Sequence, residues 1–404
     1  MRVWKFVVGL GVLLIPFSLA QVQITVWHSV NDPALRQLIQ GFNRAQNEVR
    51  VEEVYAGNHN ELVTRLQAAV AARRQPEVVF LEVTRFGLFA ERGVLERLEP
   101  YLRSDPALQA DLLPAARSAS TYRNRTYVLP LVVVVPVMYY NKALFKQAGL
   151  DPQRPPRTWG ELEAAARRLS REGQWGVNIP GQWVRWAFVK QNSGEWIDEG
   201  GRVLINAAPS VAAYEYLLGL VRQGSASREA ALKEDVGRQL FYAGRVGITF
   251  DSSGNYGFYT QNVGFELGVA ALPCQVKCAA PIGGTAMGMT SAAPPEKKRA
   301  AWAFMRYLLH PENHAKLVTQ SNFMPLRQST LERPEVQAHF RTNPQWQLFN
   351  QQLKVAFPRP RPPAMPAIRL MEETVWQSMV VGQKTPQQAL DDFAAEIRRM
   401  LAQP

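Results

Sequence analysis

Polar residues that could bind a ligand directly follow apolar, strand-like stretches at two places near the N-terminus. His28 and Ser29 follow the stretch 22–27, and Glu82 and Thr84 follow the stretch 77–81. In α/β proteins, ligands bind beyond the carboxyl ends of the parallel strands. A carboxylate there accepts hydrogen bonds from hydroxyl groups. The pattern therefore predicts a site for a small polar molecule.

The histidines and serines form no recognisable catalytic motif. His310 and His314 are four residues apart, but Pro311 stands where a helical zinc-protease motif requires Glu. We interpret both histidines as helix-surface or capping residues. The chain has neither a nucleophile-elbow sequence nor a phosphate-binding P-loop. We predict no enzyme activity, no metal and no cofactor, and keep a secreted hydrolase as the alternative from another class.

The only two cysteines are Cys274 and Cys278. Two thiols are too few for a structural zinc site, which needs four ligands. In an oxidising compartment the pair could form a small disulfide loop. The sequence leaves open whether they are bonded.

The first twenty residues have the pattern of a secretory signal peptide. Arg2 and Lys5 precede an apolar stretch at 7–17, and small residues at Ser18 and Ala20 predict cleavage after Ala20. The stretch is shorter than the ~20 residues that a membrane span needs. We therefore expect a periplasmic or otherwise extracytoplasmic protein.

Composition indicates a folded chain of about two domains. It has 404 residues, of which 47% are hydrophobic and 20% charged. The formal net charge is +12, but the basic residues are scattered. We expect no nucleic-acid partner and interpret the charge as a means to attract anionic ligands or to keep the protein soluble.

Alternating strand and helix patterns place the candidate residues in an α/β fold. Asp32-Pro33 predicts a helix start after the first strand. Strands are expected at 49–55 and 77–81, with a helix from about 60 to 74 between them, in a largely parallel sheet. A proline-containing strand pair around 129–140 predicts a crossing between two lobes.

The C-terminal third contains further crossings and helices. Gly283-Gly284-Thr285 is expected at a second crossing. The segment 358–363 has four prolines and is expected to be a loop or linker. Residues 368–401 are predicted to be helical.

Several motifs along the mature chain resemble one receptor family. The chain resembles the glycerol-3-phosphate and glycerophosphodiester-binding proteins of Ugp-type ABC importers. The motifs that carry the resemblance are Trp27-His28-Ser29, Tyr55-Ala56-Gly57-Asn58, the stretch around Glu82, Pro136 to Lys142, Pro156 to Trp159, Gly283-Gly284-Thr285, and Arg361 through Met365-Pro366 to Arg369.

The resemblance implies a two-lobed periplasmic-binding-protein fold with a hinge. The expected boundaries are 21–136 plus 283–330 for lobe one and 137–282 plus 331–404 for lobe two. It also implies a monomer that captures a small-molecule ligand and delivers it to the permease subunits of an ABC transporter.

The resemblance further implies a set of ligand-binding residues. His59 stands at the position of an aromatic residue, and Glu82 at that of a glutamate that binds glycerol hydroxyls. Trp183 and Trp186 match stacking tryptophans, and Arg361 matches an arginine that pairs with phosphate. Phosphate contacts are also expected from Ser252 or Ser253 and from the backbone at Gly284 or Thr285.

Two positions depart from the family pattern. Val132 to Val135 replace a serine-containing segment, and Phe323 stands where the family has tyrosine. Each lost hydrogen bond to a charged group costs roughly 1.5–3 kcal/mol. We therefore predict that a glycerophosphodiester binds better than glycerol-3-phosphate. An oligosaccharide is the alternative ligand, and it gains support if Arg361 points away from the cleft.

Overall fold

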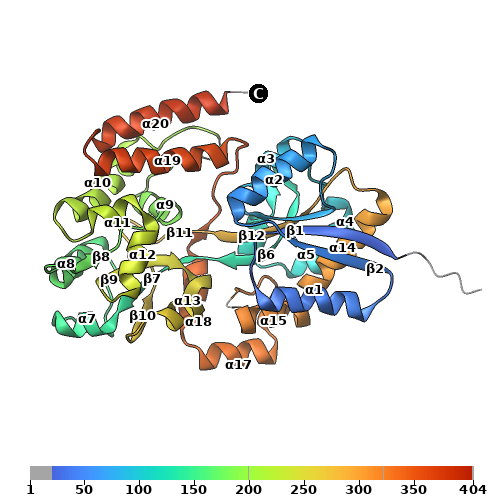
Figure 1. Ribbon diagram of the computed structural model, residues 1–404, viewed down its shortest axis with the longest axis horizontal. Coiled ribbons are helices and arrows are strands. Elements are labelled where there is room, and N and C mark those ends of the chain that lie inside the picture. Colours follow the sequence, from blue (N-terminus) through green and yellow to red (C-terminus); the bar gives the residue numbers. More distant parts are fainter. Residues whose placement is uncertain (1–20, 199, 322, 403–404) are drawn as a thin grey trace, which may run out of the picture.

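A computed structural model describes residues 21–198, 200–321 and 323–402 of the chain. The predicted signal peptide lies outside these residues. The protein has a mixed α/β fold with two lobes that lie side by side (Figure 1). This arrangement confirms the fold class predicted from the sequence.

Lobe one is built on a five-stranded sheet in the order β2-β1-β3-β12-β6. Its strands are β1 (Val22–His28), β2 (Val49–Tyr55), β3 (Val78–Glu82), β6 (Val128–Val134) and β12 (Gly283–Met289). β1, β2 and β3 are parallel, as predicted, whereas β12 is antiparallel to both β3 and β6. A polar group after β1 or β3 therefore lies at the same edge of the sheet.

Helices cover this sheet and supply the rest of the first core. They are α1 (Pro33–Ala45), α2 (His59–Ala71), α3 (Phe86–Glu91), α4 (Glu99–Arg103), α5 (Pro106–Asp111), α6 (Pro114–Ser118), α14 (Pro295–Leu309), α15 (Pro311–Ser321) and α16 (Gln328–Leu331). The Asp32 side chain caps α1 by accepting a hydrogen bond from the Leu35 N–H, and Asn58 and Glu61 form a capping box on α2. A short hairpin, β4 (Thr121–Tyr122) and β5 (Arg125–Thr126), projects beside α3.

Lobe two contains a four-stranded sheet in the order β10-β7-β9-β8. Its strands are β7 (Pro136–Asn141), β8 (Trp175–Val177), β9 (Val246–Ser252) and β10 (Leu267–Ala270). The helices packed around it are α7 (Lys142–Gln147), α8 (Trp159–Leu169), α9 (Gln182–Gln191), α10 (Ala208–Arg222), α11 (Arg228–Leu232), α12 (Glu234–Tyr242), α13 (Tyr256–Asn262), α19 (Met365–Val380) and α20 (Pro386–Leu401).

The chain crosses between the lobes at three places. The first crossing joins β6 to β7 at Val135, and the second joins β11 (Ala280–Pro281) to β12. The third lies between α16 of lobe one and β13 (Ala356–Phe357), which pairs with β11, and residues 358–364 then run past lobe one to α19. This last segment is the proline-rich linker, and it contains neither helix nor strand, as its composition predicts.

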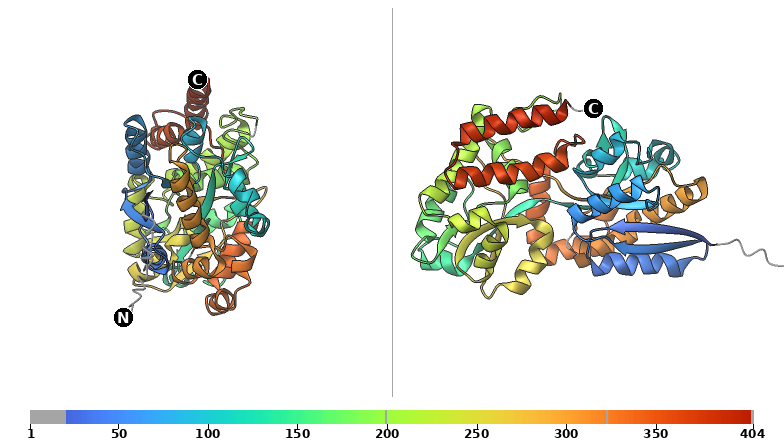
Figure 2. Two further views of the ribbon diagram at one scale, coloured as in Figure 1. Left: turned by 90° about the vertical axis from the view of Figure 1, so that its right-hand side faces the viewer. Right: turned by 45° about the horizontal axis from the view of Figure 1, so that its top comes forward.

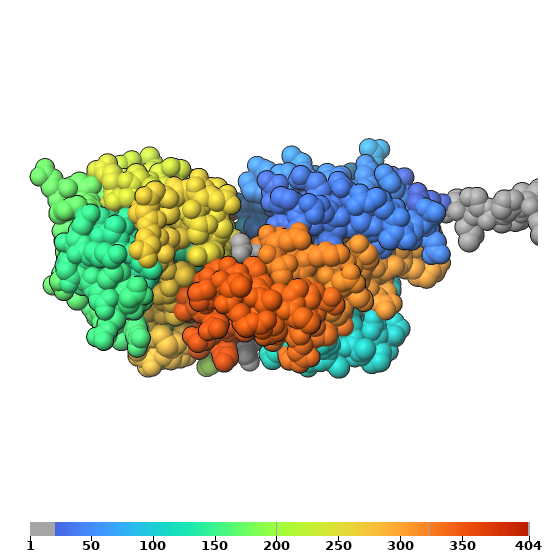
Figure 3. All heavy atoms as spheres, turned by 90° about the horizontal axis from the view of Figure 1, so that it is seen from below, coloured from blue at the N-terminus to red at the C-terminus, as the bar shows by residue number. Residues whose placement is uncertain are grey.

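Helices α17 (Pro334–Thr342) and α18 (Gln345–Lys354) lie across the waist of the molecule, in orange in Figure 3. Their buried side chains Val336, Phe340, Trp346 and Phe349 join the core that contains the five-stranded sheet. These residues follow the predicted lobe boundary at 330. The lobe boundaries expected from the sequence stay predictions.

The C-terminal tail is two helices rather than one. α19 and α20 lie side by side on lobe two (Figure 2). Gly382 adopts φ of +82°, which favours glycine, and Thr385 caps α20 just before Pro386. These signals end one helix and start the next, so the continuous helix expected over 368–401 is wrong at this point.

Cys274 and Cys278 form a disulfide that closes a small loop beside α8. Within the described ranges, no helix is both long enough and apolar enough to cross a membrane.

Candidate functional site

Glu82 ends β3 at the cleft and is buried, with 6% of its surface exposed. Its Oε2 accepts hydrogen bonds from the hydroxyl of Thr84 and from Arg369 Nη1, the latter at 3.0 Å. Its Oε1 accepts one from Arg359 Nη2. The carboxylate is therefore occupied by groups of the protein itself.

Three arginines surround this single carboxylate. Arg359 of the linker and Arg369 of α19 donate to Glu82, and Arg85 Nε lies 3.6 Å from Glu82 Oε2. Burial raises the pKa of Glu82, but the nearby guanidinium groups outweigh it and hold that pKa far below its usual range. Burial lowers the pKa of Arg359 to about 10, so Arg359 stays protonated at neutral pH. The cluster of Glu82, Arg85, Arg359 and Arg369, called the arginine cluster below, has a formal charge of +2.

Each of these arginines keeps a donor nitrogen that no described residue occupies, and in Arg359 it is the buried Nη1. Arg369 uses Nε for Gln182 Oε1 and Nη1 for Glu82 and Thr84, which leaves Nη2. Arg85 uses Nη1 for the His59 carbonyl, and its Nη2 has no hydrogen bond within the described part of the chain. A planar guanidinium with free donors is well suited to phosphate or carboxylate oxygens.

Arg361 does not point into the cleft. Its Nε, Nη1 and Nη2 donate to the backbone carbonyls of Val83, Thr121 and Ser118 at 2.8, 2.8 and 2.9 Å. Its guanidinium also lies over the Phe86 ring, 5.2 Å from the centroid. The side chain anchors the linker to lobe one, and each of its three nitrogens already donates to a backbone carbonyl of that lobe.

The two predicted tryptophans have different surroundings. Trp183 is half-buried, and its ring packs on Gly283 at the second crossing, so closely that a Cβ on Gly283 would lie 2.6 Å from the ring. Trp186 is completely buried and stacks on Trp196, with ring centroids 4.2 Å apart. Only Trp183 is placed to contact a ligand.

The two predicted serines lie at the end of β9, and Ser253 contacts the first crossing. Ser253 is fully buried, and its Oγ accepts a hydrogen bond from the Val135 N–H at 3.2 Å. Ser252 is half-buried, and its Oγ accepts one from the Gly254 N–H. Ser252 is thus the serine that lies nearer to solvent at the cleft.

The segment Gly284-Thr285 belongs to β12, with Thr285 opposite Glu82 on β3. Gly284 has φ of +124°, and a Cβ there would lie 1.9 Å from the Val132 carbonyl oxygen. Glycine is therefore required by the close approach of β6. Thr285 and Phe323 are buried, at 3% and 9% exposure.

His59 begins α2 close to the arginine cluster. Its Nδ1 lies 2.7 Å from the hydroxyl of Ser29, which follows β1. Burial lowers its pKa, so the ring is neutral at neutral pH. A neutral imidazole can exchange a hydrogen bond with a ligand without adding charge.

Sequence reasoning missed most of the arginine cluster and Gln182. Arg369 was present only as part of the Met365-Pro366 motif, and Arg85 follows the polar residues after β3 that the sequence did single out. Arg359 is two residues before Arg361 in the linker. Nothing in the spacing of Arg359 and Arg361 indicated which of them faces Glu82.

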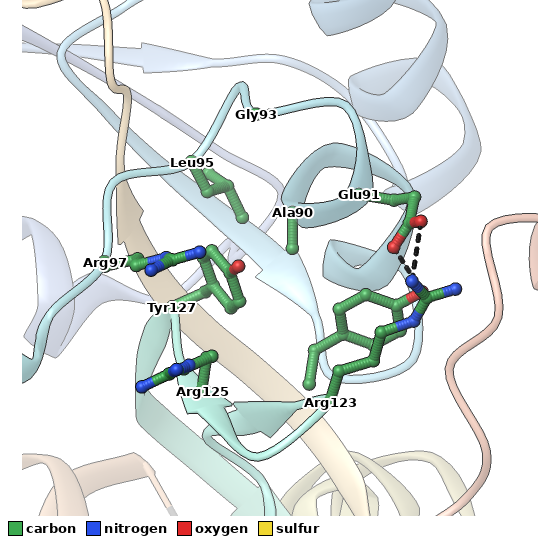
Figure 4. Close-up of a pocket in the computed structure, with 9 residues that line it drawn as sticks. Ala90, Glu91, Gly93, Leu95, Arg97, Arg123, Arg125 and Tyr127 are labelled. Atoms are coloured by element: carbon green, nitrogen blue, oxygen red, sulfur yellow. Dashed lines mark hydrogen bonds and ion pairs between the residues drawn. The ribbon is translucent and has the colours of Figure 1, made fainter.

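Two cavities lie beside the arginine cluster, and Arg359 lines the larger one. A groove of about 1270 Å³ runs between the lobes along the linker, lined on one side by the β4–β5 hairpin and on the other by the end of α20. A cavity of about 430 Å³ on lobe one continues from it, with Glu91, Arg97, Arg123, Arg125 and Tyr127 around it (Figure 4). In this second cavity Arg123 is paired with Glu91 at 2.9 Å.

A two-lobed α/β fold with a charged cleft between its lobes defines a substrate-binding protein. The family model of bacterial extracellular solute-binding proteins matches residues 37–342. The chain belongs to this family, and its curated relatives confirm the Ugp type expected from the sequence.

One relative is the sn-glycerol-3-phosphate-binding periplasmic protein UgpB of Salmonella typhimurium. It is 28% identical over 93% of this chain and 91% of its own length. UgpB of Escherichia coli O6:H1 is 26% identical over 95% of this chain and 93% of its own length.

Solved structures show the same fold. UgpB of Mycobacterium tuberculosis in complex with glycerophosphocholine has a TM-score of 0.84 at 21% identity, covering 94% of this chain and 98% of that one. Lmo0181 of Listeria monocytogenes in complex with cycloalternan has a TM-score of 0.84 at 22% identity, covering 95% and 100%. Both the phosphodiester receptor and the sugar receptor therefore share this architecture.

Proposed function

We propose that the protein is the extracytoplasmic receptor of an ABC importer for a glycerol-phosphate compound. The observation that carries the proposal is the arginine cluster, in which three guanidinium groups share one carboxylate. A bound phosphate offsets the remaining positive charge and accepts hydrogen bonds from the free donors of Arg369 and Arg85. Arg369 takes the role that the sequence assigned to Arg361.

A glycerophosphodiester is the favoured ligand over glycerol-3-phosphate. Val134 is half-buried at the end of β6, and its Cγ1 would lie 3.1 Å from a Cβ placed on Gly254. Phe323 is buried. These side chains offer no hydrogen bonds to the third charged oxygen of a phosphate monoester, whereas a diester has an ester group in its place.

An oligosaccharide is the second candidate. Arg361 is turned away from the cleft, and the half-buried Trp183 ring offers a surface on which a sugar could stack. However, the arginine cluster has a formal charge of +2, which a neutral sugar would leave without a counter-charge. This favours the phosphate ligand.

The test is calorimetric titration of protein that has been unfolded, dialysed and refolded to remove retained ligand. We expect glycerophosphocholine to bind more tightly than glycerol-3-phosphate, and maltotriose to bind weakly. Tighter binding of glycerol-3-phosphate would refute the diester preference. Binding of maltotriose alone would establish the sugar receptor instead.

Export and delivery belong to the same proposal. The monomeric receptor is expected to leave the cytoplasm by cleavage after Ala20 and to present its ligand to membrane permease subunits. No catalytic step is proposed. N-terminal sequencing of the exported protein should begin at Gln21, and a retained leader would contradict cleavage.

A further inference from the structure

Several buried donors in and beside the arginine cluster have no hydrogen-bond acceptor among the described residues. Arg85 Nε lies 3.6 Å from Glu82 Oε2, and the two others considered first are Arg359 Nη1 and Gln182 Nε2. The Arg359 side chain is 1% exposed and Gln182 is 6% exposed. A buried donor without a partner costs free energy, and such groups are rare in folded proteins unless a ligand or water satisfies them.

The orientation of each donor is fixed by the other atoms of its side chain. Arg359 gives Nε to the Ile282 carbonyl at 3.2 Å and Nη2 to Glu82, so only Nη1 is left. Gln182 Oε1 accepts a hydrogen bond from Arg369 Nε at 3.1 Å. Because Arg369 can only donate, the amide oxygen must face it, and the amide nitrogen is the atom left without a partner.

Trp183 links these two donors in space. It follows Gln182 in α9, and its ring packs on Gly283, the residue after the Ile282 that binds Arg359. Its Nε1 also lacks a partner. An unpartnered indole N–H alone indicates no ligand, since Trp346 has one in the core. Here, however, contacts on both sides join Trp183 to the arginine cluster. Glu82 binds both Arg359 and Arg369. Arg359 reaches the second crossing, on which the Trp183 ring packs, and Arg369 binds Gln182 in α9.

We propose that Gln182 Nε2, Arg359 Nη1 and Trp183 Nε1 form a donor-only subsite for an acceptor-only oxygen of the ligand. The inference rests on the proposed function, in which that oxygen belongs to the phosphodiester held by Arg369. A hydroxyl suits the subsite less well than an acceptor-only oxygen, because it brings a proton of its own to a place where three donors meet. Gln182 thus determines specificity for phosphate esters over sugars.

Two substitutions remove donors with little change in shape. Gln182→Glu keeps an acceptor for Arg369 but places a carboxylate oxygen where the amide donates. Trp183→Phe keeps an aromatic ring on Gly283 and removes the indole N–H. We expect affinity for glycerophosphocholine to fall about 10- to 100-fold in Gln182→Glu and severalfold in Trp183→Phe. The control Trp346→Phe removes an unpartnered indole N–H from the core and should leave affinity unchanged.

Calorimetric titration with glycerophosphocholine reads out affinity, and thermal unfolding without ligand verifies that each variant is folded. If Gln182→Glu does not fold, Gln182→Met removes the same donor without adding charge. Wild-type affinity in a folded Gln182 variant and in Trp183→Phe would overturn the subsite while the proposed function stands. A wild-type protein that binds no phosphate ester would refute the proposed function itself.

Discussion

Arg369 Nη1 of α19 lies 3.0 Å from Glu82 Oε2 of β3, so an ion pair joins lobe two to lobe one across the cleft. Glu82 keeps a second cation, Arg359, which belongs to the linker. A ligand phosphate can therefore take up the free donor of Arg369 without leaving the carboxylate unpaired. The pair positions the cation that we expect to hold the ligand.

Replacing Arg369 should weaken phosphate binding strongly. Arg369→Gln removes both the positive charge and the planar guanidinium that can donate two parallel hydrogen bonds. We expect affinity for glycerophosphocholine to fall roughly 100-fold or more. Arg369→Lys keeps the charge alone and should recover only part of it. Calorimetric titration measures both. Arg399→Gln, on the exposed face of α20, is the matched control and should bind like wild type.

Replacing Arg361 should cost stability rather than affinity. Arg361→Met leaves the carbonyls of Val83, Thr121 and Ser118 without their donor, and we expect the free energy of unfolding to fall by roughly 3 kcal/mol. Urea unfolding measures this change. The folded variant should bind the ligand within tenfold of wild type. A large loss of affinity with unchanged stability would restore Arg361 as the phosphate ligand predicted from the sequence.

A methyl group at Gly87 should push the linker off lobe one. A Cβ there would lie 2.0 Å from the Arg361 carbonyl oxygen, which is backbone and cannot turn aside. We expect Gly87→Ala to lower the free energy of unfolding by about 1–3 kcal/mol. Gly219→Ala in α10 is the control, because nothing lies within 4 Å of its Cβ. That variant should gain about 0.5–1 kcal/mol, and equal effects in the two variants would contradict the packing argument.

His314 should make the protein less stable in acid. Burial lowers the pKa of His314 from its ordinary value of 6.5 to about 4. The unfolded chain therefore binds a proton at a higher pH than the folded one, so stability falls as pH drops from about 6.5 to about 4 and is fully present above that window. The shift amounts to roughly 3 kcal/mol.

The non-titrating variant His314→Gln isolates this effect. Its amide can still donate to the Leu131 carbonyl, which lies 3.4 Å from His314 Nε2 in the wild type. Urea unfolding at pH 7 and pH 4 should show a smaller loss of stability in the variant than in the wild type. Identical losses would show that other groups account for the acid sensitivity.

The sequence predicted the lobes well because their elements have local signals. Asp32-Pro33 begins α1, and polar residues follow β1 and β3 where the cleft lies. Pro136 begins β7 at the predicted crossing. The break at Gly382 was missed because the apolar periodicity continues on both sides of a short turn.

The site was predicted less well because side-chain direction is not a local property. Trp183 and Trp186 are three residues apart on α9, and only the tertiary packing decides that Trp186 faces Trp196 in the core. Arg359 and Arg361 are two residues apart in the linker, and only tertiary contacts decide that one faces Glu82 and the other the Thr121 carbonyl. The resemblance placed the phosphate contact on Arg361, whereas we propose it for Arg369 of α19.

The anchoring of Arg361 also determines where the linker can pivot before α19. Arg361 is held on lobe one, whereas α19 begins at Met365 in the core of lobe two, so the bending torsions between these two points must lie in 362–364. Pro362 and Pro363 have fixed φ angles, which leaves few torsions to turn. Arg369 is only about 6 Å along the helix from this pivot. Because Arg369 is so close to this pivot, we expect its position relative to lobe one to change little when the lobes open. The arginines of the cluster should then already lie close together when a ligand arrives. Closure of the lobes should mainly move residues that lie farther from the pivot toward the ligand.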